Sequence, residues 1–131
     1  MEILVGYDGS KVAEDALKLA KKQALAFDAT RVHVVTSMTR ADNSQLDEVT
    51  EAEGGLEYAK SIIENKGVPC ETHLLIRGLA PGEDIVAFAR EYQVDVIVVG
   101  LRKRSRVGKL LLGSTARYVI LNAHCPVLSL K

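Results

Sequence analysis

The residues with the clearest chemical potential lie in one basic, glycine-containing stretch, residues 100–115, which read GLRKRSRVGKLLLGST. Gly100 can turn the backbone sharply because it has no Cβ atom, and Gly113-Ser114-Thr115 stands at the start of a helical pattern. The first N–H groups of a helix have no intrahelical partner and carry the positive end of its dipole. A phosphate group docked there would accept hydrogen bonds from these N–H groups and from both hydroxyls. The basic side chains would add charge-assisted bonds. The same residues would equally suit a capped helix that follows a solvated loop.

Other kinds of reactive site find less support in the sequence. Gly108-Lys109 does not form a Walker A loop, because position 103 is not a glycine and no Ser or Thr follows Lys109. The histidines show no HExxH or similar spacing, so we assign no catalytic role to His33, His73 or His124. The two cysteines belong to no Cys-x-x-Cys or Cys/His cluster. Their spacing predicts reduced thiols in or near the core rather than a structural zinc site.

Apolar runs and helical patterns alternate along the chain and would position these residues. Five apolar runs predict buried strands, at residues 3–7, 32–35, 70–76, 96–99 and 127–130. Between them, apolar side chains recur at helical spacing and predict four helices, the first capped by Ser10. Gly54-Gly55 interrupts the second helical pattern, and each glycine costs about 1 kcal/mol relative to alanine. The order βαβαβαβαβ with short connections predicts a doubly wound, Rossmann-like α/β sheet with parallel strands.

This topology also predicts where a ligand would bind. In doubly wound sheets, ligands bind outside the carboxyl ends of the strands, at the point where the strand order reverses. If the order is 3-2-1-4-5, that point lies between the first and fourth strands. Asp8 would then lie on one side of the crevice and Gly100 on the other.

Bulk properties set limits on the class of protein. The chain has 131 residues, a length suited to a single domain covering residues 1–131. Its 17 basic and 17 acidic residues give a formal net charge of zero, which argues against a nucleic-acid partner. No apolar run approaches the ~18 residues of a membrane span, and the N-terminus does not resemble a secretory signal. We therefore expect no membrane partner and a cytoplasmic location.

Four segments carry a resemblance to a known family. They are ILVGYDGS at the start of the chain, VDVIVVG before the basic stretch, KLLLGSTARYVI after it and the terminal CPVLSL. In this order and at this spacing they resemble the universal stress protein family over essentially the whole chain. Nucleotide-binding members of that family carry the loop pattern G-x2-G-x9-G-[ST]. Here Gly100 and Gly113-Ser114 match the pattern, and Lys103 replaces the middle glycine.

The lysine leaves two outcomes open for nucleotide binding. A side chain at position 103 restricts positive φ angles and adds bulk where the family's loop comes close to the ribose and phosphates. It also adds a cation that could bind a phosphate directly, and the concentration of Arg102, Arg104 and Arg106 nearby favours this second outcome. Lys103 would then replace a backbone contact by a side-chain contact.

The resemblance also implies contacts for individual residues. Asp8 matches the family's aspartate near the adenine and ribose, although Asp-Gly-Ser is by itself a common turn. Ser37 matches a position whose backbone meets the adenine edge, Val99 and Gly100 line the crevice, and Thr115 follows Ser114 into the helix. The implied ligand is ATP or a related adenine nucleotide. A magnesium ion, if present, would lie on the phosphates with at most a carboxylate or hydroxyl from the protein.

The expected partner surface is the last strand. PVLSLK is short, apolar and terminal, so it should form a sheet edge, and an exposed edge can pair with another chain. The resemblance implies an isologous homodimer around this strand, whereas Lys131 could simply blunt the edge of a monomer.

Three functions are therefore considered. The first is a nucleotide-responsive binding or signalling module of a stress-response protein. The second is a nucleotide-free homodimer that acts through protein contacts. The third is a slow ATP hydrolase or phosphotransfer enzyme, for which the sequence offers no general base beyond Asp8.

Overall fold

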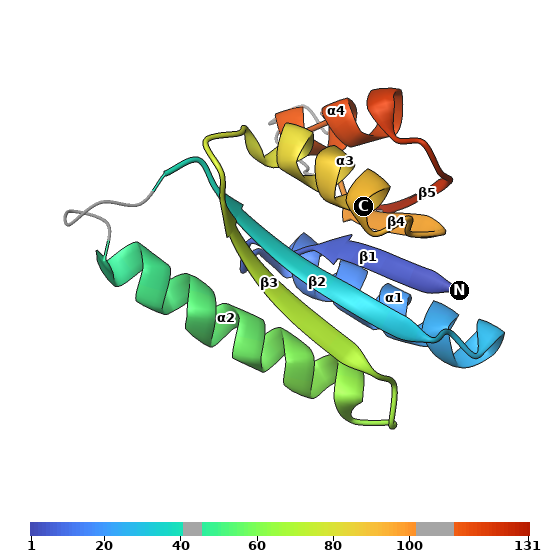
Figure 1. Cartoon of the computed structure of the whole chain (residues 1–131). Coiled ribbons are helices and arrows are strands. Elements are labelled where there is room, and N and C mark those ends of the chain that lie inside the picture. The colour runs from blue at the N-terminus through green and yellow to red at the C-terminus, as the bar shows by residue number, and fades with distance from the viewer. Residues whose placement is uncertain (41–45, 102–111) are drawn as a thin grey trace, which may run out of the picture.

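The protein forms one five-stranded parallel sheet, in the order β3-β2-β1-β4-β5 (Figure 1). The computed structural model describes residues 1–40, 46–101 and 112–131. The strands are β1 (Glu2–Gly6), β2 (Arg31–Met38), β3 (Cys70–Ile76), β4 (Val96–Gly100) and β5 (Val127–Leu130). This is the predicted strand order, and it places the reversal between β1 and β4.

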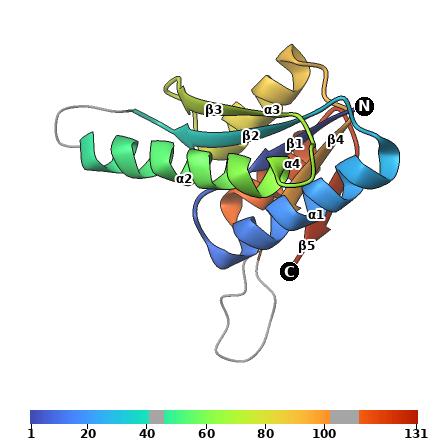
Figure 2. The same ribbon diagram turned by 90° about the horizontal axis from the view of Figure 1, so that it is seen from below.

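Four helices cover both faces of the sheet. They are α1 (Lys11–Phe27), α2 (Leu46–Glu64), α3 (Pro81–Glu91) and α4 (Ser114–Asn122). Figures 1 and 2 show α1 and α2 on one face and α3 and α4 on the other. The predicted doubly wound, Rossmann-like α/β fold is therefore confirmed. Within the described residues, no helix combines the length and apolar character needed to cross a membrane.

The two faces of the sheet support separate layers of core. Ile3 and Val5 of β1 pack toward α1 and α2, whereas Leu4 between them packs toward α3. All three side chains are fully buried. Because helices cover both faces, neither face of a central strand can be polar, which explains the uninterrupted apolar runs of β1 and β4.

Helix α2 follows the helical spacing that the sequence predicted. It runs without a break from Leu46 to Glu64, through Gly54 and Gly55, which interrupt the apolar pattern. Its stability comes from one buried stripe, formed by Leu56, Ala59 and Ile63. Packing of an apolar face contributes more to helix stability than intrinsic propensity does, so the two glycines weaken α2 without ending it.

Candidate functional site

A pocket of about 230 Å³ opens at the carboxyl ends of β1 and β4. Seven of the nine residues predicted for the site line it, and they come from four separate parts of the chain: Asp8, Ser37, Val99, Gly100, Gly113, Ser114 and Thr115. The topology brings them together because parallel strands place all their carboxyl ends at one edge. The other two, Arg102 and Lys103, lie outside the described residues.

The wall of the pocket is more apolar than the predicted residues suggest. Val12 at the start of α1, Val35 of β2 and Ile85 of α3 line the pocket alongside Val99. The sequence analysis missed Val35 and Ile85 because they lie within apolar patterns that served only to predict core, and it missed Val12 because this residue lies outside the buried stripe of α1. A pocket with an apolar wall and polar groups at its ends suits a flat, partly aromatic ligand that carries a charged group.

The turn after β1 is built by local hydrogen bonds. Gly9 has a φ angle of +83°, a conformation that glycine adopts without strain. The Asp8 carboxylate accepts a hydrogen bond from the Ser10 N–H at 3.0 Å. The Ser10 hydroxyl in turn caps α1 by accepting from the Ala13 N–H at 3.2 Å. The predicted cap is therefore confirmed, and Asp8 takes the turn-forming role that Asp-Gly-Ser favours.

The end of β2 is held by side-chain bonds on both sides. The Thr36 hydroxyl donates to the backbone carbonyl of Tyr7 at 2.8 Å. The Ser37 hydroxyl donates to the Asp84 carboxylate at 2.7 Å, and Arg77 donates to the other oxygen of Asp84 at 2.6 Å. Asp84 is fully buried, so this pairing satisfies a charge that would otherwise be costly. The Ser37 side chain therefore anchors β2 to α3.

Burial also affects the phenol of Tyr7, whose ring lies beside Gly55 of α2. Tyr7 is 8% exposed. Burial, reinforced by the nearby carboxylate of Glu14, raises the pKa of the Tyr7 phenol. The phenol is therefore protonated at neutral pH and can donate a hydrogen bond.

The start of α4 has no side-chain cap within the described residues, and its N-cap residue is Gly113. The first intrahelical bond joins the Arg117 N–H to the Gly113 carbonyl at 3.0 Å. The preceding N–H groups therefore point outward at the positive end of the helix dipole, next to the hydroxyls of Ser114 and Thr115 in the pocket.

Gly100 is also needed for close packing between two elements. A Cβ atom at this position would lie 2.8 Å from Cγ2 and 2.9 Å from the carbonyl oxygen of Val12. Gly100 therefore lets α1 approach β4 closely, a contact that the sequence analysis did not predict.

Both cysteines are free thiols, as predicted. Cys70 is buried at the start of β3, and Cys125 is partly buried after α4. Burial raises the pKa of Cys70 to about 11, so its thiol is unreactive at neutral pH.

Comparison with known proteins agrees with this geometry. A family model described as the universal stress protein family matches residues 1–131. A universal stress protein of Methanocaldococcus jannaschii is 36% identical over 140 residues, covering 99% of this chain and 81% of that protein.

Two solved structures are also similar over the whole chain. A universal stress protein from Archaeoglobus fulgidus is 42% identical, with a TM-score of 0.91, and covers 100% of this chain and 98% of that one. A universal stress protein from Archaeoglobus fulgidus in complex with dAMP is 38% identical, with a TM-score of 0.84 and the same coverage. By its sequence and its fold alike, this chain belongs to the universal stress protein family.

Proposed function

We propose that this protein binds an adenine nucleotide in the pocket between β1 and β4 and acts as a nucleotide-responsive binding or signalling module in the stress response. One observation carries the proposal: the pocket joins an apolar wall to the uncapped start of α4. A relative that is 38% identical over the whole chain is in complex with dAMP, which supports the same ligand class here.

The lining residues divide naturally among the parts of such a ligand. The base would lie against Val12, Val35 and Val99, with the backbone at Ser37 along its edge. The phosphates would lie at the start of α4, where backbone N–H groups and the hydroxyls of Ser114 and Thr115 are donors. Asp8 lies across the pocket, close to where the ribose would bind.

The number of phosphates and the metal are finer parts of the proposal. ATP with Mg²⁺ would bring its outer phosphates toward the basic segment, where Arg102 and Lys103 stand in the sequence. If Lys103 binds a phosphate, Lys103→Gly weakens ATP binding and leaves AMP binding nearly unchanged. If its bulk obstructs the loop, Lys103→Gly strengthens both.

Calorimetric titration of nucleotide-stripped protein tests the proposal. AMP, dAMP, ADP and ATP would be titrated with and without Mg²⁺ at two salt concentrations. We expect saturable binding that weakens with salt, because charged contacts to phosphate are screened. Replacing Ser114 and Thr115 together by alanine should lower the affinity at least about tenfold.

The matched control is Ser61→Ala, which removes an exposed hydroxyl on α2, away from the pocket, and should leave binding unchanged. Absence of heat with every nucleotide, in protein that stays folded, would refute the proposal and favour a protein that acts through its surfaces. ATP turnover that Asp8→Asn abolishes, with binding retained, would favour the slow hydrolase.

We further propose that the protein forms a homodimer through β5. This strand lies at one edge of the sheet and pairs with β4. The carbonyls of Pro126 and Leu130 accept bonds from the N–H groups of Ile97 and Leu101, so the alternate residues Val127 and Ser129 turn their backbone groups to the outer edge. Ser129→Pro removes one outward N–H without removing a bond to β4. It should convert a dimer to a monomer in light scattering, whereas Ser129→Ala should not.

The cytoplasmic location expected from the sequence stays a prediction.

A further inference from the structure

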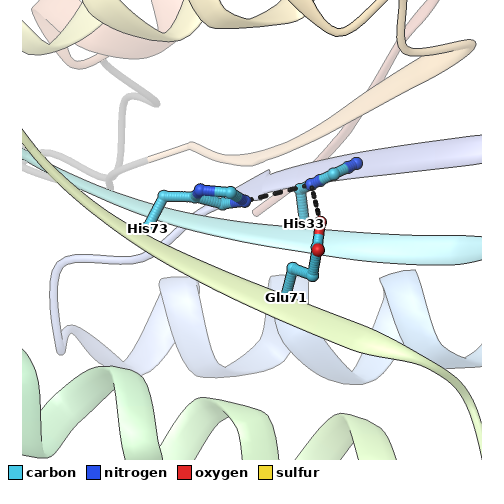
Figure 3. Close-up of side chains that lie close together, drawn as sticks. All are labelled: His33, Glu71 and His73. Carbon is cyan, nitrogen blue, oxygen red and sulfur yellow. Dashed lines mark hydrogen bonds and ion pairs between the residues drawn. The ribbon is translucent and has the colours of Figure 1, made fainter.

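A second polar cluster lies on the amino-terminal halves of β2 and β3, on the face covered by α3. The register pairs His33 with Glu71 and Val35 with His73. Because side chains on one face recur every second residue, His33, Glu71 and His73 all project from the same face. Figure 3 shows the three side chains converging. The proposed nucleotide pocket lies at the opposite, carboxyl ends of the strands.

Two of the separations within this cluster are close to those of metal ligands. His33 Nδ1 lies 3.1 Å from His73 Nε2 and 3.6 Å from the Glu71 carboxylate. All three ligand atoms lie within 4.8 Å of one another. Ligand atoms about 2.0–2.1 Å from a tetrahedral zinc ion are roughly 3.3 Å apart. The first two separations differ from this by a few tenths of an ångström, and the carboxylate of Glu71 can rotate to reach the same ion.

Hydrogen bonding points the lone pair of His33 at the cluster. A carboxylate oxygen of Glu2 lies 2.9 Å from His33 Nε2, so this nitrogen carries the proton and donates to Glu2. His33 Nδ1 is then unprotonated and faces His73 and Glu71. A histidine that donates its other ring N–H to a carboxylate is the usual arrangement at metal sites, where it fixes the tautomer and raises the basicity of the ligand.

The rings are held in place and the site remains accessible. His33 is fully buried, and Phe88 of α3 packs edge-on against it with ring centroids 5.5 Å apart. Phe88 also packs on His73 at 4.7 Å. The Glu71 side chain is 48% exposed and belongs to β3, the outer strand of the sheet, so an ion can enter from solvent. Packing of this kind preorganises ligands on rigid strands.

One basic group competes for the carboxylate. Arg31 Nη1 lies 3.1 Å from the Glu71 oxygen that faces His33. A carboxylate has two oxygens, so Glu71 can bind an ion through one and keep Arg31 on the other. Without an ion, the row from Glu2 through His33 to His73 is a satisfied hydrogen-bond chain, and this is the competing explanation of the cluster.

We propose that His33 Nδ1, His73 Nε2 and the Glu71 carboxylate bind one divalent first-row transition-metal ion, with Zn²⁺ the best match. Two imidazoles and one carboxylate are a donor set that zinc accepts, and the fourth position is open to water. The ion joins β2 to the outer strand β3 and stabilises that edge of the sheet. This site is independent of the nucleotide pocket and does not depend on the proposed function.

Metal titration of the full chain tests the site. Chelator-treated, nucleotide-free protein would be titrated with Zn²⁺ by calorimetry, and with Co²⁺ by visible absorption, which reports tetrahedral coordination. We expect one ion per chain. His73→Gln and Glu71→Gln should each weaken binding at least about tenfold, and Glu2→Gln should weaken it by roughly 10–100-fold by removing the partner of His33. These three residues are partly or largely exposed, so the variants should fold.

The matched control is His124→Gln, because His124 is an exposed histidine outside the cluster and adjoins Cys125. It should bind Zn²⁺ as the parent protein does. A second readout is thermal: at Zn²⁺ concentrations 100-fold above the dissociation constant, the melting temperature should rise by roughly 10 °C. His73→Gln should lose this rise.

Three results would overturn the proposal. The first is no Zn²⁺ or Co²⁺ binding by folded protein. The second is binding that survives in both His73→Gln and Glu71→Gln. The third is binding lost on His124→Gln or on alkylation of Cys125, which would assign the ion to the end of α4. Because nucleotide is absent throughout, none of these results bears on the nucleotide pocket.

Discussion

Replacing Gly100 by alanine should destabilise the protein through one identifiable contact. The new Cβ would lie 2.8 Å from Val12 Cγ2, 2.9 Å from the Val12 carbonyl oxygen and 3.1 Å from its carbonyl carbon. The methyl group can rotate away, but the carbonyl belongs to the first turn of α1. The whole start of the helix must therefore move away from β4.

The magnitude follows from two opposing terms. Overpacking of this kind destabilises the folded protein by about 1–3 kcal/mol. Alanine also lowers the conformational entropy of the unfolded chain, which offsets this loss of stability by about 0.4–1 kcal/mol. We expect a net loss of about 1–2 kcal/mol, or roughly 3–10 °C in melting temperature for a chain of this size. Because Val12 and Gly100 both line the pocket, affinity for adenine nucleotide should also fall.

Gly54→Ala is the matched control, since it makes the same chemical change in a different setting. No atom lies within 4 Å of a Cβ at Gly54, which is exposed within α2. Alanine there should therefore stabilise the protein by about 0.5–1 kcal/mol. Urea denaturation followed by far-ultraviolet circular dichroism measures both variants. The reasoning is refuted if Gly100→Ala unfolds at the same urea concentration as the parent protein, or at a higher one.

Three further predictions concern caps, buried charge and thiols. Asp84→Ala leaves Arg77 without its buried partner and should lower the free energy of unfolding, measured by urea denaturation, by roughly 2–4 kcal/mol. This loss is smaller than that expected for a fully buried ion pair, because Arg77 stays partly hydrated. Ser10→Ala removes the cap of α1 and should cost about 1 kcal/mol. With iodoacetamide at pH 8, folded protein should be alkylated at Cys125 and spared at Cys70, whose pKa of about 11 leaves roughly 100-fold less thiolate than an ordinary thiol. The reactivity of Cys70 should rise about tenfold per pH unit up to that pKa.

Controls for these variants come from exposed positions. Asp15→Ala breaks an exposed pair with Lys11 at 3.1 Å and should change stability by less than about 0.5 kcal/mol. If Asp84→Ala is no more destabilising than Asp15→Ala, the Asp84 pair does not anchor the end of β2. Equal alkylation of both cysteines in folded protein would contradict the placement of Cys70.

Much of the fold could be predicted because a doubly wound parallel sheet requires a recognisable apolar pattern in the sequence. β1 and β4 are covered on both faces, so their residues read as unbroken apolar runs. The bounds of β3 and β5 are those predicted. The strand order then placed Asp8 and Gly100 on opposite sides of one crevice, and both line the pocket.

Contacts across the fold were less accessible from the sequence. Ser37 lines the pocket, but its bond to Asp84 depends on α3 packing against the end of β2. A buried aspartate in the first turn of a helix looks, in sequence, like an ordinary helix-start residue. In the same way, the need for glycine at position 100 comes from the close approach of Val12, which is far away in the chain.

The histidines show why a site can escape sequence reasoning altogether. His33 and His73 stand 40 residues apart, and neither belongs to a metal-binding motif. They meet because β2 and β3 pair in parallel, with a whole helix between them in the chain. A shift of one residue in that register would move Glu71 and His73 to the opposite face of β3 and separate them from His33. The same parallel pairing that gathers loops into a nucleotide pocket at one end of the sheet therefore gathers three possible metal ligands at the other.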